Sequence, residues 1–371
     1  MASILTVCAA ALLAFAVSHL LSRACSRQDY LPDHPNGRSS HGEVTPRSGG
    51  IAIMAGWVCG AVIVACFIDD ISMTADLLKL SALGIFVLLI GFIDDRYSLS
   101  PLYKLAGQFA VAALFVWAFG GVTTAPLPIV GDFGLGPASV FVSIFWIVAF
   151  MNAYNFMDGA HGIAATAAII VLAALAIATM KAGGGLVGVA GVLLAVSLIG
   201  FLRVNFPQGR LFMGDNGSQS VSLLIAGFAL IAANKSDGAV SPLFVPTAMM
   251  PFLYDVAFTL GHRAGRRQNV LSAHNEHLYQ LLIRQGVSHV RVTAFYASLT
   301  ALSTAAAIMM LRAPASSQWM FPTLLAVLFV PASLALFLKC RREGYFTKTV
   351  VEDGEAAYAN QNVRPLHQAA E

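Results

Sequence analysis

The chain has 371 residues, of which 57% are hydrophobic and only 11% are charged, with a net charge of +3. Soluble globular domains carry charged residues at about a quarter of their positions, so this composition excludes a soluble protein, and the small net charge gives no indication of nucleic acid binding. The apolar runs are long and continuous instead of alternating over about ten residues, which excludes an outer-membrane β-barrel. A bilayer core about 30 Å thick needs about 20 apolar residues per helix, and the chain holds enough for roughly ten or eleven crossings.

The apolar runs predict an all-α polytopic membrane protein with about eleven transmembrane helices. The first run has no basic residue before it and is followed by Arg23 and Arg27, which reverses the charge order of a signal peptide and predicts an uncleaved helix with its N-terminus outside. We expect a membrane domain over residues 1–338 and a polar cytoplasmic tail over residues 339–371. In chain order, the predicted crossings are residues 2–22, 49–68, 77–93, 104–120, 138–152, 161–179, 185–202, 219–234, 241–260, 293–311 and 320–338.

Basic residues are distributed unevenly between the predicted loops. When successive loops are assigned to alternating sides, all but four of the 22 lysines and arginines lie on one side. Cytoplasmic loops of membrane proteins collect Lys and Arg, so this side is predicted to be the cytoplasm, and the C-terminus lies there too. The four exceptions are Lys79, Lys181, Lys235 and Arg312.

Two adjacent carboxylates, Asp94 and Asp95, follow the third predicted crossing, and Lys104 begins the next one. Adjacent carboxylates repel each other, which is tolerable where they engage a divalent cation or a cationic substrate complex. A solvated helix end is the simpler alternative. Asp69 and Asp70 stand in a nearly identical Phe-Ile-Asp-Asp setting, but on the predicted outer side, so we assign no chemistry to them.

Polar residues at helical spacing mark the end of the fifth crossing. Asn152, Asn155 and Asp158 are three residues apart and would share one helix face. Polar side chains at the end of a lipid-embedded helix cost free energy unless they find partners, and we expect phosphates, a metal or a nucleotide. The alternative is hydrogen bonding between helices, which the charge of Asp158 makes the less favoured interpretation.

The eighth crossing is preceded by Asp215, within a Gly-Asp-Asn-Gly-Ser string. A helix N-terminus presents unpaired N–H groups and the positive end of the helix dipole. Asp215 is therefore either a simple N-cap or a metal-holding carboxylate beside a phosphate.

The longest internal cytoplasmic loop, about residues 261–292, carries Arg267, His274 and His277. The two histidines lack a third nearby ligand, which argues against structural zinc, whereas arginines and histidines together suit a polyanion. Asp255, inside the ninth crossing, is an intramembrane carboxylate and hence a site candidate, with pairing to a neighbouring group as its alternative role.

Taken in order, these motifs resemble the polyprenyl-phosphate N-acetylhexosamine-1-phosphate transferase family, most of all its O-antigen-initiating branch. The resemblance implies transfer of a sugar 1-phosphate from a UDP-sugar to undecaprenyl phosphate, with release of UMP and with Mg²⁺ or Mn²⁺ as cofactor, at the start of lipopolysaccharide or other cell-surface polysaccharide synthesis. It also implies a multi-pass protein of the bacterial inner membrane with a cytoplasmic active site, and a homodimer is one assembly we consider. The motifs that carry the resemblance are residues 45–50, 91–95, 100–104, 152–159, 214–218 and 274–280.

The resemblance also implies a role for each matching residue. Asp94 or Asp95 would orient or deprotonate the lipid phosphate and help to hold the metal, and Asp215 would be a direct metal ligand. Asp158, the third catalytic candidate, would line the nucleotide and metal pocket. The candidates for substrate binding are Lys104, Asn152, Asn155, Arg47, His274, His277 and Arg267.

One departure from the family pattern concerns His161, which stands where many members carry a second Asp. The main competing hypothesis is an ion-coupled secondary transporter. Transporter sites lie near the bilayer midplane in broken helices, whereas the polar clusters here lie at helix ends. Asp255 is the residue that favours the transporter hypothesis.

Overall fold

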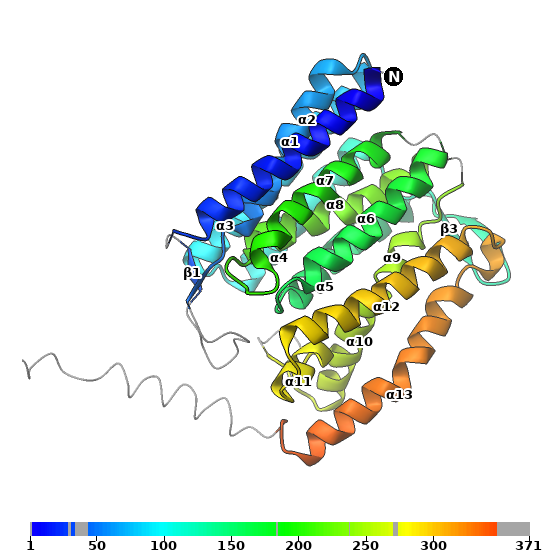
Figure 1. Ribbon diagram of the computed structural model, residues 1–371. Coiled ribbons are helices and arrows are strands. Elements are labelled where there is room, and N and C mark those ends of the chain that lie inside the picture. Colours follow the sequence, from blue (N-terminus) through cyan, green and yellow to red (C-terminus); the bar gives the residue numbers. More distant parts are fainter. Residues whose placement is uncertain are drawn as a thin grey trace, which may run out of the picture.

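The computed structural model describes residues 2–28, 31–33, 44–182, 185–236, 238–269 and 274–346. Within these residues, ten helices are long and apolar enough to cross a membrane, which confirms the all-α polytopic class (Figure 1). They are α1 (Ala2–Cys25), α2 (Gly49–Phe67), α3 (Ile71–Tyr97), α4 (Pro101–Phe119), α5 (Ala138–Met157), α6 (Ile163–Lys181), α7 (Gly185–Asn205), α8 (Gly214–Lys235), α12 (His289–Met310) and α13 (Met320–Arg342).

The ninth predicted crossing is not one helix. It is divided into α9 (Phe244–Ala248) and α10 (Met250–Gly265), so the expected eleven crossings become ten uninterrupted helices and one broken segment. Pro251 stands in the first turn of α10. Proline has no N–H to continue the preceding helix and its ring clashes with the previous turn, whereas it is well tolerated where a helix begins.

Short elements complete the described chain. A seven-residue helix, α11 (Leu278–Arg284), follows α10, and a 3₁₀ helix, η1 (Ala315–Ser317), precedes α13. Two antiparallel hairpins pair β1 (Pro32–Asp33) with β2 (Thr45–Pro46), and β3 (Thr124–Leu127) with β4 (Gly131–Gly134).

Helix α8 is the centre of the bundle. Every residue from Asn216 to Ala232 is buried, although the first turns of this helix are polar. Close packing brings its start against α2 and α3: a Cβ added at Gly50 would collide with the backbone of Gly217, and one added at Gly91 with the backbone of Asn216. The absence of these two Cβ atoms therefore lets the N-terminus of α8 lie against both helices.

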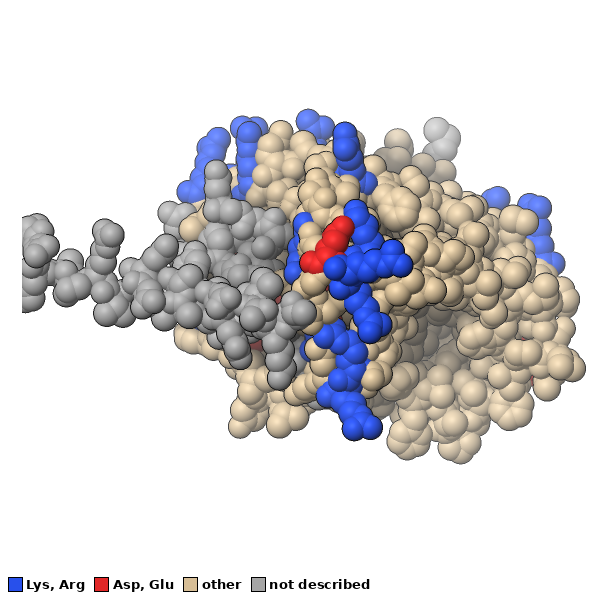
Figure 2. All heavy atoms as spheres, turned by 90° about the horizontal axis from the view of Figure 1, so that it is seen from below, with Lys and Arg blue, Asp and Glu red and all other residues tan. Residues whose placement is uncertain are grey.

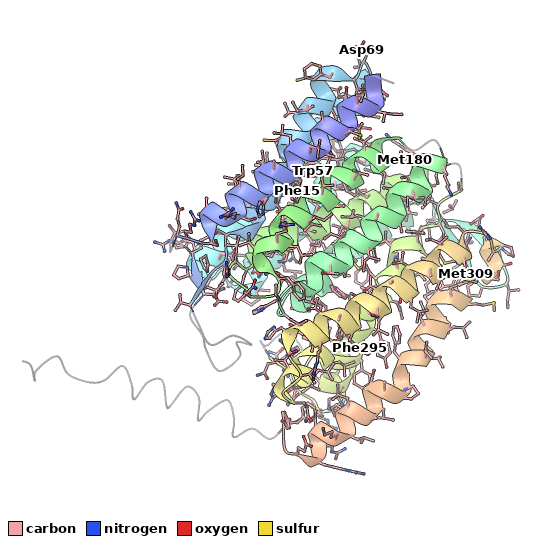
Figure 3. All side chains as sticks on the ribbon, viewed as in Figure 1. Phe15, Trp57, Asp69, Met180, Phe295 and Met309 are labelled. Atoms are coloured by element: carbon pink, nitrogen blue, oxygen red, sulfur yellow. The ribbon has the colours of Figure 1, made fainter. Side chains whose placement is uncertain are left out.

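Among the described residues, the helix ends that carry the predicted motifs meet at one end of the bundle. The ends of α3, α5 and α10 and the starts of α4, α8 and α12 lie there together with α11 (Figure 1). We call this end the motif face. Figure 2 views the molecule from below, towards this end, and Lys and Arg side chains are spread across it. Asp69 lies at the opposite end of the bundle (Figure 3), as the alternation of sides predicted.

The two ends of the helical chain lie on opposite ends of the bundle, since α1 begins far from the motif face and α13 ends on it (Figure 1). Which end faces the cytoplasm stays a prediction. The predicted tail from residue 339 begins inside α13, which continues to Arg342, and residues 347–371 of that tail lie outside the described residues.

Candidate active site

Five of the predicted site residues converge around the start of α8. Asp94 and Asp95 lie in the last turn of α3, Lys104 in the first turn of α4, Asn155 in the last turn of α5, and Asp215 in the first turn of α8. They meet because each helix reverses direction across the bundle, so the end of one and the start of the next reach the same face. The helices that carry them are all packed on or beside α8.

Asp95 holds the N-terminus of α8. Its Oδ1 accepts a hydrogen bond from the backbone N–H of Asp215 at 3.1 Å, and its Oδ2 accepts from the N–H of Asn216 at 2.9 Å and from Asn216 Nδ2 at 2.6 Å. A carboxylate at this position satisfies N–H groups that have no partner in the helix and faces the positive end of the helix dipole. Both oxygens of Asp95 are thus engaged by α8, which favours a positioning role over direct contact with substrate.

Lys104 joins the other two carboxylates of this cluster. Its Nζ lies 2.7 Å from Asp94 Oδ2 and also forms an ion pair with Asp215 Oδ2. The remaining oxygen of Asp94 accepts the backbone N–H of Leu99 at 3.0 Å. Asp94 is 9% exposed, whereas Lys104 and Asp215 are 25% and 27% exposed. The ammonium group therefore lies between two acids at a place that solutes can reach.

Asn155 completes the surroundings of Asp215. Its Nδ2 donates to Asp215 Oδ1 at 2.7 Å and lies 2.7 Å from Ser218 Oγ. Asp215 is thereby held between the amide of α5 and the ammonium of α4. Both of its oxygens point to donor groups whose place a bound cation could take.

Asn152 has a different role from Asn155, although both share a helix face. Its Nδ2 donates to Gln108 Oε1 at 2.7 Å, and Gln108 Nε2 donates to Gln219 Oε1 at 2.9 Å. This chain of amides links α5, α4 and α8, which matches the alternative of hydrogen bonding between helices. The sequence reasoning missed Gln108 and Gln219, although an amide inside an apolar run is a signal for such a bond.

Asp158 directly follows α5 and stands apart from these networks. Its side chain makes no hydrogen bond or ion pair with the described residues. Burial raises the pKa of this carboxyl well above its usual range, and the negative charges of Asp215 and Asp95 raise it further. A cation bound beside Asp158 would therefore stabilise the charged form of this carboxyl group, which lies close to the acidic cluster.

His161, which replaces the family's second Asp, belongs to a neighbouring contact. Its ring stacks on that of His289 with 4.2 Å between centroids, and its Nδ1 lies 3.2 Å from the carbonyl oxygen of Pro207. The substitution thus connects the loop after α5 to the start of α12 and to the loop before α8. Among the described residues, it adds no ligand to the group around Asp215.

The histidine loop packs on the end of α5. His277 is the residue before α11; its ring stacks on Phe156 with 5.7 Å between centroids, and its Nδ1 lies 3.2 Å from Asp255 Oδ1. The ring of His274 lies 4.9 Å from that of His277. Burial, together with the neighbouring His277 and Arg263, lowers the pKa of His274 to about 3. His274 is therefore neutral at physiological pH and can offer a hydrogen bond to a substrate but no positive charge.

The two predicted arginines are placed differently. The Arg47 guanidinium pairs with Asp33, and its carbonyl oxygen accepts from Asn216 Nδ2 at 2.7 Å, so Arg47 braces the start of α8. Arg267 is exposed after α10 with a left-handed φ of 56°. Within the described residues, Arg267 contacts none of the other predicted site residues.

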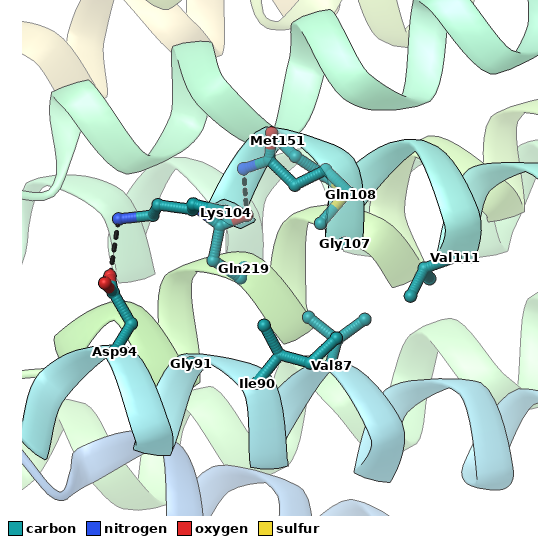
Figure 4. A pocket seen from close by; sticks show the side chains of 10 residues that line it. All are labelled: Val87, Ile90, Gly91, Asp94, Lys104, Gly107, Gln108, Val111, Met151 and Gln219. Carbon is teal, nitrogen blue, oxygen red and sulfur yellow. Dashed lines mark hydrogen bonds and ion pairs between the residues drawn. The ribbon is translucent and has the colours of Figure 1, made fainter. Parts of the chain in front are cut away.

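An apolar groove leads away from the charged cluster. It is a narrow groove between α3 and α4, with Asp94 and Lys104 at one end (Figure 4). Towards its other end lie the apolar side chains of Val87 and Val111. The remaining lining residues are Ile90, Gly91, Gly107, Gln108, Met151 and Gln219. The groove therefore has an ion pair at one end and mostly apolar side chains beyond it.

The chemistry of the acidic cluster suits a hard divalent cation. Asp94, Asp158 and Asp215 supply only oxygen ligands, which Mg²⁺ and Mn²⁺ prefer. In the part of the chain that the structure describes, no three acids or histidines already converge at metal-binding distance. Mg²⁺ commonly uses one or two carboxylates together with substrate phosphates, so the pair bridged by Lys104 fits such a site.

Comparison with known proteins agrees with the geometry. Residues 77–233 match the model of glycosyl transferase family 4. The chain is 30% identical over 260 residues to the probable undecaprenyl-phosphate N-acetylglucosaminyl 1-phosphate transferase of Bacillus subtilis, covering 69% of this chain and 71% of that one. It is 33% identical over 292 residues to the decaprenyl-phosphate N-acetylglucosaminephosphotransferase of Mycobacterium tuberculosis, covering 70% of each.

A more distant relative is the undecaprenyl-phosphate alpha-N-acetylglucosaminyl 1-phosphate transferase of Escherichia coli O157:H7, at 24% identity over 71% of this chain and 72% of that one. These matches confirm the family that the motifs predicted. The chain therefore belongs to the polyprenyl-phosphate N-acetylhexosamine-1-phosphate transferases, a family of membrane enzymes.

Proposed function

We propose that this enzyme transfers an N-acetylhexosamine 1-phosphate from a UDP-sugar to undecaprenyl phosphate and releases UMP. The observation that carries the proposal is Lys104, whose ammonium bridges Asp94 and Asp215 at the head of an apolar groove. A phosphorylated lipid needs a cationic group at the membrane surface and an apolar channel directly beneath it. The names of the relatives, which are polyprenyl-phosphate sugar phosphotransferases, support the same reaction.

The acceptor would enter along the groove between α3 and α4. Its first isoprene units would lie against Val87 and Val111, and its phosphate would exchange with the carboxylates as the partner of Lys104. Asp94 would orient the phosphate and accept its proton when the phosphate arrives singly protonated. The geometry therefore supports direct attack on the donor, without a covalent intermediate on an aspartate.

In the reaction itself, an oxygen of the lipid phosphate attacks the phosphorus that carries the sugar. A new P–O–P bond forms, the bond between the two donor phosphates breaks, and UMP leaves with the bridging oxygen. Such transfers depend on positioning and on neutralising charge more than on covalent chemistry. Asp95 contributes by fixing the start of α8, and Asn155 by orienting Asp215.

Asp215, Asp94 and Asp158 are the residues that would hold Mg²⁺ or Mn²⁺. The bound cation would neutralise the diphosphate of the donor. Asp158, which has no cationic partner among the described residues, would gain one when donor and cation bind. His274 and His277 would line the donor side of the site from the loop that packs on α5.

We further propose N-acetylglucosamine as the first sugar to test, because the relatives with 30% and 33% identity carry that sugar in their names. Initiation of O-antigen, an inner-membrane location and a cytoplasmic active site stay predictions. The uneven distribution of Lys and Arg supports the last of these. The homodimer also stays a prediction.

The test is UMP release by purified protein given undecaprenyl phosphate, Mg²⁺ and a panel of UDP-sugars. We expect release that requires the lipid and ends when the divalent cation is chelated. Asp215→Asn serves as the inactive control. The proposed function would be contradicted if no donor led to UMP release in an assay where the Bacillus subtilis relative is active.

A further inference from the structure

Asp255 is a buried carboxylate that the proposed reaction does not use. It lies in α10 and is 1% exposed. A charged group inside a membrane protein is costly unless it is paired or fully hydrogen-bonded. The contacts of its two oxygens therefore indicate what this buried carboxylate does.

The first set of contacts joins Asp255 to α11. Its Oδ1 accepts the backbone N–H of Leu278 at 2.9 Å, and its Oδ2 accepts that of Tyr279 at 3.2 Å. These are N–H groups of a first helical turn, which have no partner within their own helix. Asp255 thus caps a helix that begins 23 residues later in the chain.

The second set of contacts joins Asp255 to the rest of the bundle. The hydroxyl of Tyr296, on α12, donates to Oδ2 at 2.6 Å, and the hydroxyl of Thr259 donates to Oδ1 at 3.3 Å. Both oxygens are therefore satisfied by protein groups. This arrangement ties α10, α11 and α12 together and leaves no open oxygen for a transported ion, which argues against the transporter hypothesis.

A third contact reaches towards the active site. His277 Nδ1 lies 3.2 Å from Asp255 Oδ1, and the His277 ring is almost fully buried beside α10. The same ring stacks on Phe156, near the end of α5.

Tyr279 also holds α11 in place. Its hydroxyl donates to the carbonyl oxygen of Phe156 at 3.0 Å, and a Cβ added at Gly159 would collide with that hydroxyl. Asp158 lies between these two contacts in the chain. The helix capped by Asp255 is therefore pressed directly against the turn that carries a predicted catalytic carboxyl group.

We propose that Asp255 is a positioning residue for the sugar-nucleotide donor: it holds α11, and with it the His277 ring, against the turn after α5 that carries Asp158. The proposal rests on the proposed function, because it assumes that the turn after α5 borders the UDP-sugar. In this proposal, the role of the buried Asp255 carboxylate is to hold α10, α11 and α12 together beside the site.

The experiment compares Asp255→Asn with wild type in three measurements: UDP-N-acetylglucosamine affinity without acceptor, KM and kcat for UMP release, and hydrogen exchange of α11. The amide keeps the size but cannot accept all of these hydrogen bonds. Losing one bond to a charged group corresponds to about 10- to 100-fold, which we expect as weaker donor binding and higher KM with a smaller change in kcat. The amides of Leu278 and Tyr279 should exchange faster.

Asp76→Asn is the matched control, since Asp76 is also a mostly buried acid but pairs with Lys79 and Lys235 far from the motif face. It should leave donor affinity unchanged. His277→Ala should weaken donor binding as much as Asp255→Asn, and the double variant should be no weaker than His277→Ala alone, because both act through the same packing of α11 and its N-cap against the turn after α5.

The inference would be overturned if donor affinity were unchanged in Asp255→Asn or in His277→Ala, or if the losses added in the double variant. The proposed function would still stand in that case, provided that the wild type releases UMP. If the wild type releases no UMP with any donor, hydrogen exchange still decides: unaltered protection of α11 in Asp255→Asn refutes the positioning role. Should that variant not fold, Tyr296→Phe removes one bond to the same carboxylate and takes its place in each measurement.

Discussion

Replacing Lys104 by Met should have opposite effects on cation binding and on catalysis. The Lys104 ammonium lies between Asp94 and Asp215. In the proposed reaction a divalent cation would bind at these two acids, and Lys104 would meet the lipid phosphate. Lys104→Met removes the charge and keeps most of the apolar stem. We expect tighter Mn²⁺ binding together with a loss of UMP release.

The size of the gain in Mn²⁺ affinity follows from the distance between the ammonium and a bound cation and from the exposure of Lys104. Two unit charges about 4 Å apart interact by about 4 kcal/mol at an effective dielectric constant of about 20. A quarter of the Lys104 side chain is exposed and its stem is flexible, so we keep about a third of that value, about 1.4 kcal/mol, which is a tenfold gain in affinity. Loss of a charged hydrogen bond to the acceptor phosphate should lower turnover by about 10- to 100-fold.

The assay is titration of Mn²⁺ into purified protein without substrates, followed by electron paramagnetic resonance of the free ion. Arg96→Met is the matched control, since it removes a positive charge from an exposed residue beside the cluster that makes no ion pair within the described chain. Lys104→Arg keeps the charge and should bind Mn²⁺ as wild type does. Weaker Mn²⁺ binding in Lys104→Met, or an equal gain in Arg96→Met, would refute the reasoning.

Three further predictions concern the acids and the packing of the site. Asp215→Asn should abolish UMP release, whereas Asp69→Asn, at the opposite end, should keep it; equal losses would contradict the division into two faces. The raised pKa of Asp158 means that its charged form destabilises the folded state as the pH rises. Asp158→Asn should therefore unfold at a higher temperature than wild type at pH 8 without metal, and this gain in unfolding temperature should vanish towards pH 4. A gain that does not depend on pH would contradict the prediction. Gly91→Ala should cost about 1–3 kcal/mol in the free energy of unfolding, because its Cβ would clash with the backbone of α8, whereas Gly107→Ala meets only ordinary contacts at 3.5 Å and should leave denaturant stability nearly unchanged.

Hydropathy predicted most of the helices because a run of about 20 apolar residues has few alternatives to a membrane crossing. Its errors have physical causes. The predicted third crossing starts at residue 77, but α3 begins at Ile71. Asp76 interrupts the apolar run, yet the helix continues through it because its carboxylate is paired with Lys79 and with Lys235. The ninth crossing is broken at a proline that hydropathy does not penalise.

The pattern of residues also predicted which acids share a face, because each crossing reverses the direction of the chain. It could not separate the roles of neighbours. Asn152 and Asn155 have the same spacing and the same side chain, yet one meets Gln108 in the bundle and the other meets Asp215 at its surface. The partner of each depends on where a second helix lies.

The same reason applies to the acidic pair. Asp94 and Asp95 are alike in the sequence, but successive residues of a helix point about 100° apart. Gly91 lets the start of α8 approach α3 closely, so Asp95 meets the first N–H groups of α8 while Asp94 meets Lys104. Chain composition is thus sufficient to place the chemistry on one face of a membrane bundle, whereas only the packing of helices distant in sequence divides that chemistry between holding the site together and contacting the substrate.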